Sequence, residues 1–162
     1  MPTPKEIIKA LDLKPHSLEG GYYRETYRSP DVVSSPGSGE ARSGSTAIYY
    51  LLTPDTYSAL HRLPADEIFH FYGGGPVRML QLRPDGSGEL MLLGSDVLAG
   101  QRPQVVVERG VWQGSFLVPG AEFALLGATV APGFEFCDYE AGDRLALVAQ
   151  YAEFAEIIRR LT

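Results

Sequence analysis

The residues best suited to chemistry lie within the segment YSALHRLPADEIFHFYGG, residues 57–74, where histidine and glutamate occur among aromatic side chains. On alternating strand geometry His61 shares a face with Leu63, and after a short turn Glu67 shares a face with Phe69. If both faces line the interior of a barrel, the imidazole and the carboxylate meet there. Such a pair forms an acid/base couple, a metal site or a satisfied buried hydrogen bond, because buried charge must be matched.

Two other reactive side chains fit this picture less well. His70 lies an odd number of residues from Glu67, so alternation turns it away from that carboxylate, toward outer packing or a subunit contact, unless a bulge re-aims it. Cys137 has no neighbouring basic residue in sequence to lower its pKa, and we expect it to serve as a small apolar side chain.

These residues must be positioned by strands. Short runs rich in Val, Leu, Tyr and Phe alternate with Gly- and Pro-containing turns, and Pro84-Asp85-Gly86 is a strong hairpin signal. The connections are too short for helical crossovers, so the sequence predicts an all-β antiparallel sandwich or barrel. The predicted strands are 46–53, 57–63, 67–72, 77–83, 89–94, 104–108, 116–118 and 123–130.

The ends of the chain carry helical signals. Thr3 and Glu6 form a predicted capping box, Asp143 is a predicted N-cap, and residues 153–161 have an apolar stripe at helical spacing. We expect short N- and C-terminal helices, the last packed on the outside of the barrel. Residues 30–45 are mostly Ser, Gly and Pro, and we expect them to form a mobile loop.

Composition narrows the function classes. The 162 residues, 44% of them hydrophobic, suit one domain, and the net charge of −6 argues against nucleic acid as a partner. One cysteine excludes an internal disulfide, and the first residues, MPTPKEIIKALDLK, lack the features of a signal peptide. The apolar stretch 116–136 is interrupted by Pro, Gly and Glu, so no membrane span is predicted. We expect a cytoplasmic protein.

At this point the sequence resembles the cupin superfamily. His61, Glu67 and Gly74 match the first histidine, the glutamate and the glycine of the first cupin motif, while Leu63 stands at the second histidine. The second motif is similar to Gly110-Val111-Trp112-Gln113, with Gln113 in place of a histidine. The resemblance implies a metal site reduced to His61, Glu67 and Gln113, which would hold a divalent ion (Zn, Ni, Fe or Mn) weakly.

The likeness extends over nearly the whole chain. The runs EGGYYRETYRS, STAIYYLL, HRLPADEIFHFYGG, GVWQGS, VAPGFEFCDYE and the terminal RRLT resemble a small single-domain cupin family of unknown function. The resemblance implies one domain over residues 1–162, a double-stranded β-helix (jelly-roll) barrel and a homodimer. More distantly, GGYYRETYR is similar to a pocket segment of the dTDP-sugar 3,5-epimerases, which implies that His61 acts as the base.

The strand pattern and the family resemblance together indicate the candidate site. His61 and Glu67 are the candidate catalytic residues, with Arg24 and Gln113 holding substrate oxygens. The other candidate ligand-binding residues are Glu25, Tyr27, Tyr49, Phe69, Trp112 and Asp138.

Three functions remain open. The first is a homodimeric barrel that binds a small polar metabolite, such as a sugar or nucleotide-sugar, and acts as an isomerase or epimerase with His61 as general base and no required cofactor. The second is a metal-dependent oxygenase or isomerase. The third is a ligand-binding barrel without chemistry.

Overall fold

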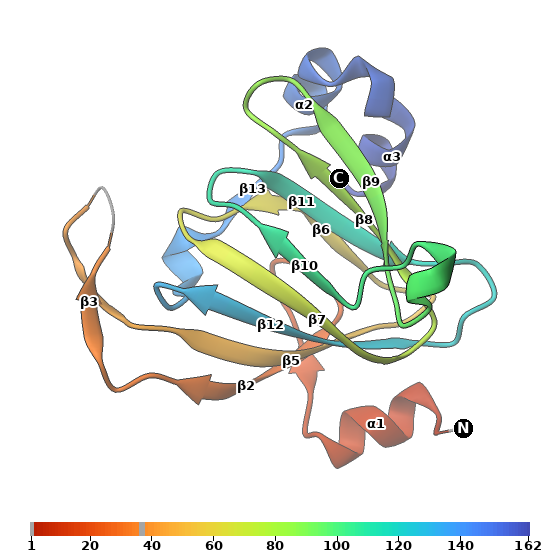
Figure 1. Ribbon diagram of the computed structural model, residues 1–162, viewed down its shortest axis with the longest axis horizontal. Helices are drawn as coiled ribbons and strands as arrows, with labels where there is room; N and C mark the ends of the chain where they lie inside the picture. Colours follow the sequence, from red (N-terminus) through yellow and green to blue (C-terminus); the bar gives the residue numbers. More distant parts are fainter. Residues whose placement is uncertain (1, 36–37) are drawn as a thin grey trace.

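The computed structural model describes residues 2–35 and 38–162, which form two large antiparallel sheets, a separate two-stranded hairpin and helices at both ends (Figure 1). The all-β jelly-roll barrel with short terminal helices is therefore confirmed. The six-stranded sheet contains, in spatial order, β1 (Lys14–Pro15), β2 (Tyr22–Arg28), β5 (Thr46–Leu52), β12 (Ala124–Ala131), β7 (Asp66–Gly74) and β10 (Gln104–Val107). The five-stranded sheet contains β13 (Glu140–Ala141), β6 (Tyr57–Arg62), β11 (Trp112–Leu117), β8 (Val77–Leu82) and β9 (Gly88–Leu93).

From β5 to β8, successive strands alternate between the two sheets. The chain passes from β5 in the first sheet to β6 in the second, returns to β7 and then enters β8. Because β6 and β7 belong to opposite sheets, an inward side chain on one faces inward side chains on the other across the barrel. This alternation is what places His61, on β6, and Glu67, on β7, around one interior.

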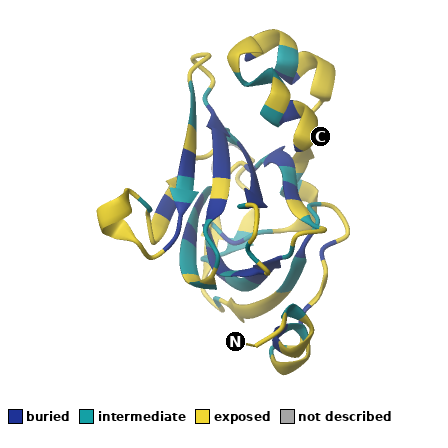
Figure 2. Cartoon of the chain, turned by 90° about the vertical axis from the view of Figure 1, so that its right-hand side faces the viewer, coloured by how far each residue is buried: buried dark blue, intermediate teal, exposed yellow. Residues whose placement is uncertain are grey.

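The barrel interior holds the main hydrophobic core. Inward side chains from both sheets, including Leu52, Phe69, Met79, Leu93 and Leu126, are almost completely buried. Figure 2 shows the buried residues along the strands and exposed residues on the outer turns of the helices. Each of these large side chains stabilises the fold by about 1.5–3 kcal/mol through burial.

The C-terminal helices cover the outer face of the five-stranded sheet. They are α2 (Arg144–Gln150), the 3₁₀ turn η3 (Ala152–Phe154) and α3 (Ala155–Arg160). Asp143 caps α2 by accepting a hydrogen bond from the Ala146 amide, as predicted. Ile158 and Leu161 pack against Leu60, Leu80 and Phe116 of the sheet, so the predicted outer packing is confirmed. The final helix is shorter than expected because η3 separates residues 152–154 from it.

The N-terminal helix α1 (Pro4–Ala10) begins at the predicted capping box, in which Thr3 and Glu6 bond reciprocally. Its Ile7 packs with Leu13, Leu51 and Phe123 on the outside of the six-stranded sheet. Within the described part of the chain, no helix has the length and apolar character that crossing a bilayer requires.

The segment 30–45 contains more regular structure than expected. Strands β3 (Val32–Ser34) and β4 (Ala41–Ser43) pair as a hairpin that projects from the barrel in Figure 1. The backbone hydrogen bonds of this pair compensate for the few apolar groups of the segment. The expected loop tip includes residues 36 and 37, which lie outside the described residues.

Candidate functional site

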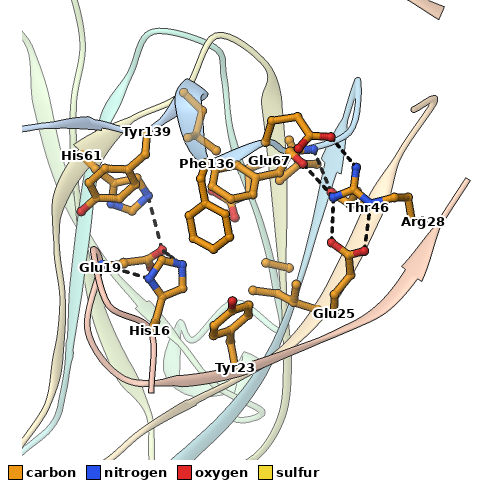
Figure 3. A pocket seen from close by; sticks show the side chains of 16 residues that line it. His16, Glu19, Tyr23, Glu25, Arg28, Thr46, His61, Glu67, Phe136 and Tyr139 are labelled. Carbon is orange, nitrogen blue, oxygen red and sulfur yellow. Dashed lines mark hydrogen bonds and ion pairs between the residues drawn. The ribbon is translucent and has the colours of Figure 1, made fainter. Parts of the chain in front are cut away.

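A cavity of about 120 Å³ opens between the two sheets, and both His61 and Glu67 line it (Figure 3). The cavity is bordered by β2, β5 and β12 on one side and by β6 on the other. Its remaining polar wall comes from His16, Glu19, Glu25, Arg28, Thr46, Glu135 and Tyr139.

His61 is held in one orientation and one tautomer. Its imidazole is 2% exposed, and Nδ1 lies 2.7 Å from the Ala59 carbonyl oxygen. Because a carbonyl oxygen only accepts hydrogen bonds, Nδ1 carries the hydrogen, and in the neutral ring Nε2 is left as a free base. The Tyr139 ring stacks on the imidazole with the centroids 4.8 Å apart, and burial raises the pKa of that tyrosine. His61 therefore presents a fixed basic nitrogen.

Glu19 is the carboxylate next to that nitrogen. Glu19 Oε2 lies 3.8 Å from His61 Nε2, which is beyond hydrogen-bond length but close enough for strong charge interaction. The Ser58 hydroxyl donates to Glu19 Oε1 at 2.5 Å and fixes the carboxylate. An imidazolium formed at His61 would be stabilised by this negative charge.

A tight turn presents Glu19 to the cavity. Gly20 and Gly21 both have positive φ, which favours glycine, and a Cβ on Gly20 would collide with the Tyr57 carbonyl oxygen. The Gly20 carbonyl also accepts a hydrogen bond of 2.8 Å from the buried Tyr50 hydroxyl. The glycine pair therefore allows the close approach that brings Glu19 beside β6.

His16 completes the same turn with the opposite tautomer. Its Nδ1 accepts a hydrogen bond of 3.0 Å from the Glu19 backbone amide, so in the neutral ring the hydrogen resides on Nε2. That nitrogen faces Glu19 Oε2 at 3.8 Å. Burial lowers the pKa of His16, opposed by the charge of Glu19. His16 is therefore a neutral neighbour of Glu19.

Glu67 is a carboxyl group that retains its proton. Burial and then the charge of Glu19 raise the pKa of Glu67 from its usual 4.5 to about 8, while a hydrogen bond from Gln113 acts in the opposite direction. The Gln113 side-chain amide donates to Glu67 Oε2. Within residues 2–35 and 38–162, Glu67 Oε1 has no hydrogen-bond partner, so it is the oxygen available to carry the acid proton toward the cavity.

Arg28 forms the charged wall opposite His61. Its guanidinium donates to both oxygens of Glu25 at 2.9 Å, to Glu135 at 2.7 Å and to the Phe134 carbonyl at 3.0 Å. A β-bulge at Thr26 brings it inward, because the register with β5 shifts between residues 25 and 27. Strict alternation from Glu25 would instead have turned Tyr27 toward the cavity.

Tyr23, Phe134 and Phe136 form an aromatic rim that borders the cavity. Phe136, on the 3₁₀ turn η2 (Phe136–Asp138), lies 5.8 Å from the His16 ring, 6.5 Å from Tyr23 and 5.5 Å from Phe134 between ring centroids. The Phe136 ring is half exposed and lies in the middle of the view in Figure 3. These rings give the cavity an apolar surface around its charged groups.

The structure places part of the expected ligand-binding set at this cavity. Glu25 lines the cavity. Gln113 is not among the lining residues, but its side chain donates a hydrogen bond to Glu67, which is one of them. Phe69 is buried in the hydrophobic core of the barrel. Asp138 accepts two hydrogen bonds from Arg42, outside the cavity lining.

The other expected residues lie on outer surfaces. Arg24 and Tyr49 pair across β2 and β5 on the face away from the cavity, with the guanidinium 5.7 Å from the Tyr49 ring centroid. Tyr27 is 52% exposed. Trp112 lies under the Arg62 guanidinium, on the side of the sheet that the C-terminal helices cover.

His70 lies on the outer face of the six-stranded sheet. It stacks near Tyr72 and contacts Thr129 and Gln104 at 3.4 Å, so alternation along β7 does separate it from Glu67.

Sequence reasoning missed several cavity residues. His16, Glu19, Tyr23 and Arg28 belong to or precede the run EGGYYRETYR, whose glycine pair and aromatics had already pointed to a pocket. Sequence reasoning also missed Thr46, Phe134, Glu135, Phe136 and Tyr139. Tyr139 stacks on His61, although its neighbour Asp138 belongs to the expected set. No local pattern fixes which of two adjacent loop residues turns inward.

The donor set does not fit a tightly bound divalent metal ion. Of the three expected ligands, Gln113 turns its NH₂ group toward Glu67, and Glu67 has a raised pKa. Leu63 adds only hydrocarbon to the lining, and His16 carries its hydrogen on the cavity-facing nitrogen. In the described residues no group of three or more His, Cys, Asp or Glu side chains is arranged to hold a metal ion. Of the three expected ligands, only His61 offers a suitable lone pair, through Nε2.

Comparisons with known proteins agree with this architecture. The uncharacterized protein YML079W of Saccharomyces cerevisiae is 37% identical over an aligned length of 155, and the match covers 86% of this chain and 77% of the yeast protein. The structure of a hypothetical protein from Leishmania major is similar at a TM-score of 0.91 and 31% identity, covering 99% of both chains. Protein SO0799 from Shewanella oneidensis gives a TM-score of 0.88 and 36% identity, covering 100% of this chain and 98% of the other. The family model described as Cupin superfamily (DUF985) matches residues 5–142, and the chain therefore belongs to this cupin family.

Proposed function

We propose that the protein binds a small polar metabolite in this cavity and transfers a proton at a carbon beside a carbonyl group, as an isomerase or epimerase does. One observation carries the proposal: the Nδ1–H of His61 is committed to the Ala59 carbonyl at 2.7 Å, which leaves Nε2 as a base facing the same cavity as the protonated Glu67. A base and an acid with opposite protonation states at one pH are what general acid–base catalysis requires.

The proposed reaction has two half-steps. His61 Nε2 removes the proton from the carbon, and the electron pair moves to the carbonyl oxygen, which receives the proton of Glu67 as an enol forms. For the epimer, the enol turns its other face to His61 before the same carbon takes the proton back, and the enol hydroxyl returns its proton to Glu67. For the isomer, His61 gives its proton to the former carbonyl carbon, and the hydroxyl on the deprotonated carbon gives its proton to Glu67 as it becomes the new carbonyl. Glu19, 3.8 Å from Nε2, stabilises the intermediate imidazolium.

The volume of the cavity limits the ligand. About 120 Å³ accommodates roughly ten water-sized groups at 10–15 Å³ each, which is close to the size of a monosaccharide. A nucleotide attached to such a sugar would have to lie outside the described cavity. We therefore favour a free sugar or another small carbonyl compound over a nucleotide-sugar.

Proton exchange tests the proposal without a known substrate. The protein is incubated in D₂O with a panel of hydroxy- and amino-carbonyl compounds of three to six carbons, and loss of the carbon-bound proton signal is followed by NMR. We expect exchange with at least one compound and a loss of about 10²-fold or more in His61→Gln. His70→Gln is the matched control and should exchange at the wild-type rate.

Saturable binding without exchange over long incubation would favour the non-catalytic barrel instead. Equal exchange by wild type and His61→Gln would remove His61 from the role of base. The homodimer implied by the family resemblance is part of the same proposal, and analytical ultracentrifugation should give twice the chain mass.

A further inference from the structure

We infer that the cavity selects a ligand carrying a protonated amine and rejects carboxylates and phosphates of similar size. The inference rests on the proposed function, because it concerns the same cavity, and it narrows the substrate class to small amino-carbonyl compounds such as amino sugars. It follows from the charges, the aromatic rim and the unpartnered polar atoms of the lining.

The only Lys or Arg side chain among the described lining residues is already neutralised. Arg28 lies between Glu25 and Glu135, and its three nitrogens are committed to these carboxylates and the Phe134 carbonyl. One positive charge against two negative charges leaves this wall with one net negative charge. An anionic ligand would have to displace an internal carboxylate before reaching the guanidinium.

The opposite wall is also negative. Glu19 accepts a hydrogen bond from the Ser58 hydroxyl. The imidazoles of His16 and His61 each lie 3.8 Å from Glu19 Oε2, which is too far for a hydrogen bond. His16 stays neutral because its Nδ1 accepts the Glu19 amide hydrogen and burial lowers its pKa. A cavity lined by charge of one sign concentrates ligands of the opposite sign, and the protein as a whole carries a net charge of −6.

Aromatic faces suit the same ligand. Tyr23, Phe134, Phe136 and Tyr139 line the cavity, and a cation against such rings is attracted by their electron-rich faces. Two polar groups that are more than nine-tenths buried are open toward the cavity: His61 Nε2 has no hydrogen-bond partner, nor has Glu67 Oε1, within the part of the chain that the structure describes. Both point to a ligand that completes them.

A protonated amine would also assist the proposed chemistry. A positive charge near a carbonyl withdraws electrons and makes the neighbouring C–H bond more acidic, so that a neutral imidazole suffices as base. The ammonium group would lie near Glu19 or the Glu25–Glu135 pair, and the carbonyl oxygen near Glu67.

Three probes that share one ring and differ in charge test the inference: benzylamine, benzyl alcohol and benzoate. The chain has three histidines, two in the cavity and one outside it, so labelled histidine ring signals report binding by NMR at pH 7.5. We expect benzylamine to shift the His16 and His61 signals saturably, with a Kd at least tenfold below that of benzyl alcohol. Benzoate should leave them unchanged, and His70 should not move with any probe.

Removing the carboxylates around Arg28 should invert the preference. In Glu25→Gln/Glu135→Gln the guanidinium is released, and benzoate should bind at least tenfold more tightly than to wild type, while benzylamine weakens. Glu140→Gln is the matched control, because Glu140 forms a similar two-point pair with Arg62 outside the cavity lining. Its probe preferences should equal those of wild type.

The wild-type titration decides the matter even if the double variant fails to fold. Benzoate binding as tightly as benzylamine, or benzylamine failing to bind saturably at millimolar concentration, would overturn the inference. If such a result is found while proton exchange still depends on His61, the inferred charge selectivity is wrong and the proposed reaction stands. If the probes bind with the expected preference but His61→Gln exchanges protons at the wild-type rate, the proposed reaction is wrong and the inferred ligand class stands.

Discussion

The carboxylate beside His61 is Glu19, whose Oε2 lies 3.8 Å from the imidazole Nε2, whereas Glu67 accepts a hydrogen bond from the side chain of Gln113. Two carboxyl groups thus have different environments and different protonation. Glu19 accepts the Ser58 hydroxyl and acts as the charge next to the base, and Glu67 is buried and keeps its proton.

Neutralising Glu19 should lower the pKa of Glu67. The charge of Glu19 is the second cause, after burial, that raises this pKa to about 8. We expect Glu19→Gln to move it part of the way back toward 4.5, because desolvation persists. Carbon-13 NMR titration of the Glu67 carboxyl measures the shift, and Glu140→Gln should leave it unchanged. An unaltered titration in Glu19→Gln would show that the two carboxyls do not interact.

Glu67 should make stability fall as the pH rises. The folded protein holds a proton up to about pH 8 that the unfolded chain releases near 4.5. The stabilisation from this group is therefore fully present below pH 4.5 and is lost as the pH rises through 8. Relative to Glu67→Gln, the wild-type free energy of unfolding should decrease by about 4 kcal/mol between pH 5 and 8.5, at about 1.4 kcal/mol per pKa unit. Parallel urea titrations at the two pH values measure it, and identical pH profiles would contradict a protonated Glu67.

Gly20→Ala should disturb both stability and the cavity. The substitution adds backbone strain of about 1–3 kcal/mol and a collision with the Tyr57 carbonyl, next to Glu19. Gly86 is the control, because its φ of +90° is close to the +93° of Gly20 and no atom lies within 4 Å of its added Cβ. Thermal unfolding should show a larger loss for Gly20→Ala, and the His61 NMR signal should shift in that variant alone. Equal losses would mean that the close approach at Gly20 is unimportant.

Metal removal should leave the function unchanged. Gln113 and Glu67 are hydrogen-bonded to each other, and Leu63 replaces a ligand with hydrocarbon. Protein purified without a nickel column should contain far less than one metal ion per chain, and prolonged dialysis against a chelator should not alter proton exchange. Stoichiometric metal, or exchange restored only by added Zn²⁺, Ni²⁺, Fe²⁺ or Mn²⁺, would support the metal-dependent alternative.

Much of the barrel could be predicted because its strands are short, amphipathic runs between Gly and Pro turns. The hairpin of residues 32–34 and 41–43 could not be predicted, because three-residue strands in a polar segment are too short to show an alternation of apolar and polar residues. His61 and Glu67 were found because alternation holds locally, from His61 to Leu63 and from Glu67 to Phe69, although each strand has a register shift elsewhere along its length.

The rest of the cavity depends on features that alternation does not encode. Because of the bulge at Thr26, Arg28 and not Tyr27 faces the cavity. The positive φ angles of Gly20 and Gly21 turn Glu19 inward from a loop. Asp138 and Tyr139 occupy a loop end where no repeating geometry predicts direction. The charge partner of His61 is thus distant from it in sequence and could be identified only once the fold was known.

Neutron diffraction of the deuterated protein at pH 7 would show whether His61 is the base and Glu67 the acid, because it locates the protons of both groups in one map. We expect a deuteron on His61 Nδ1 facing the Ala59 carbonyl, none on Nε2, and a deuteron on Glu67. A deuteron on His61 Nε2 together with an ionised Glu67 would contradict it.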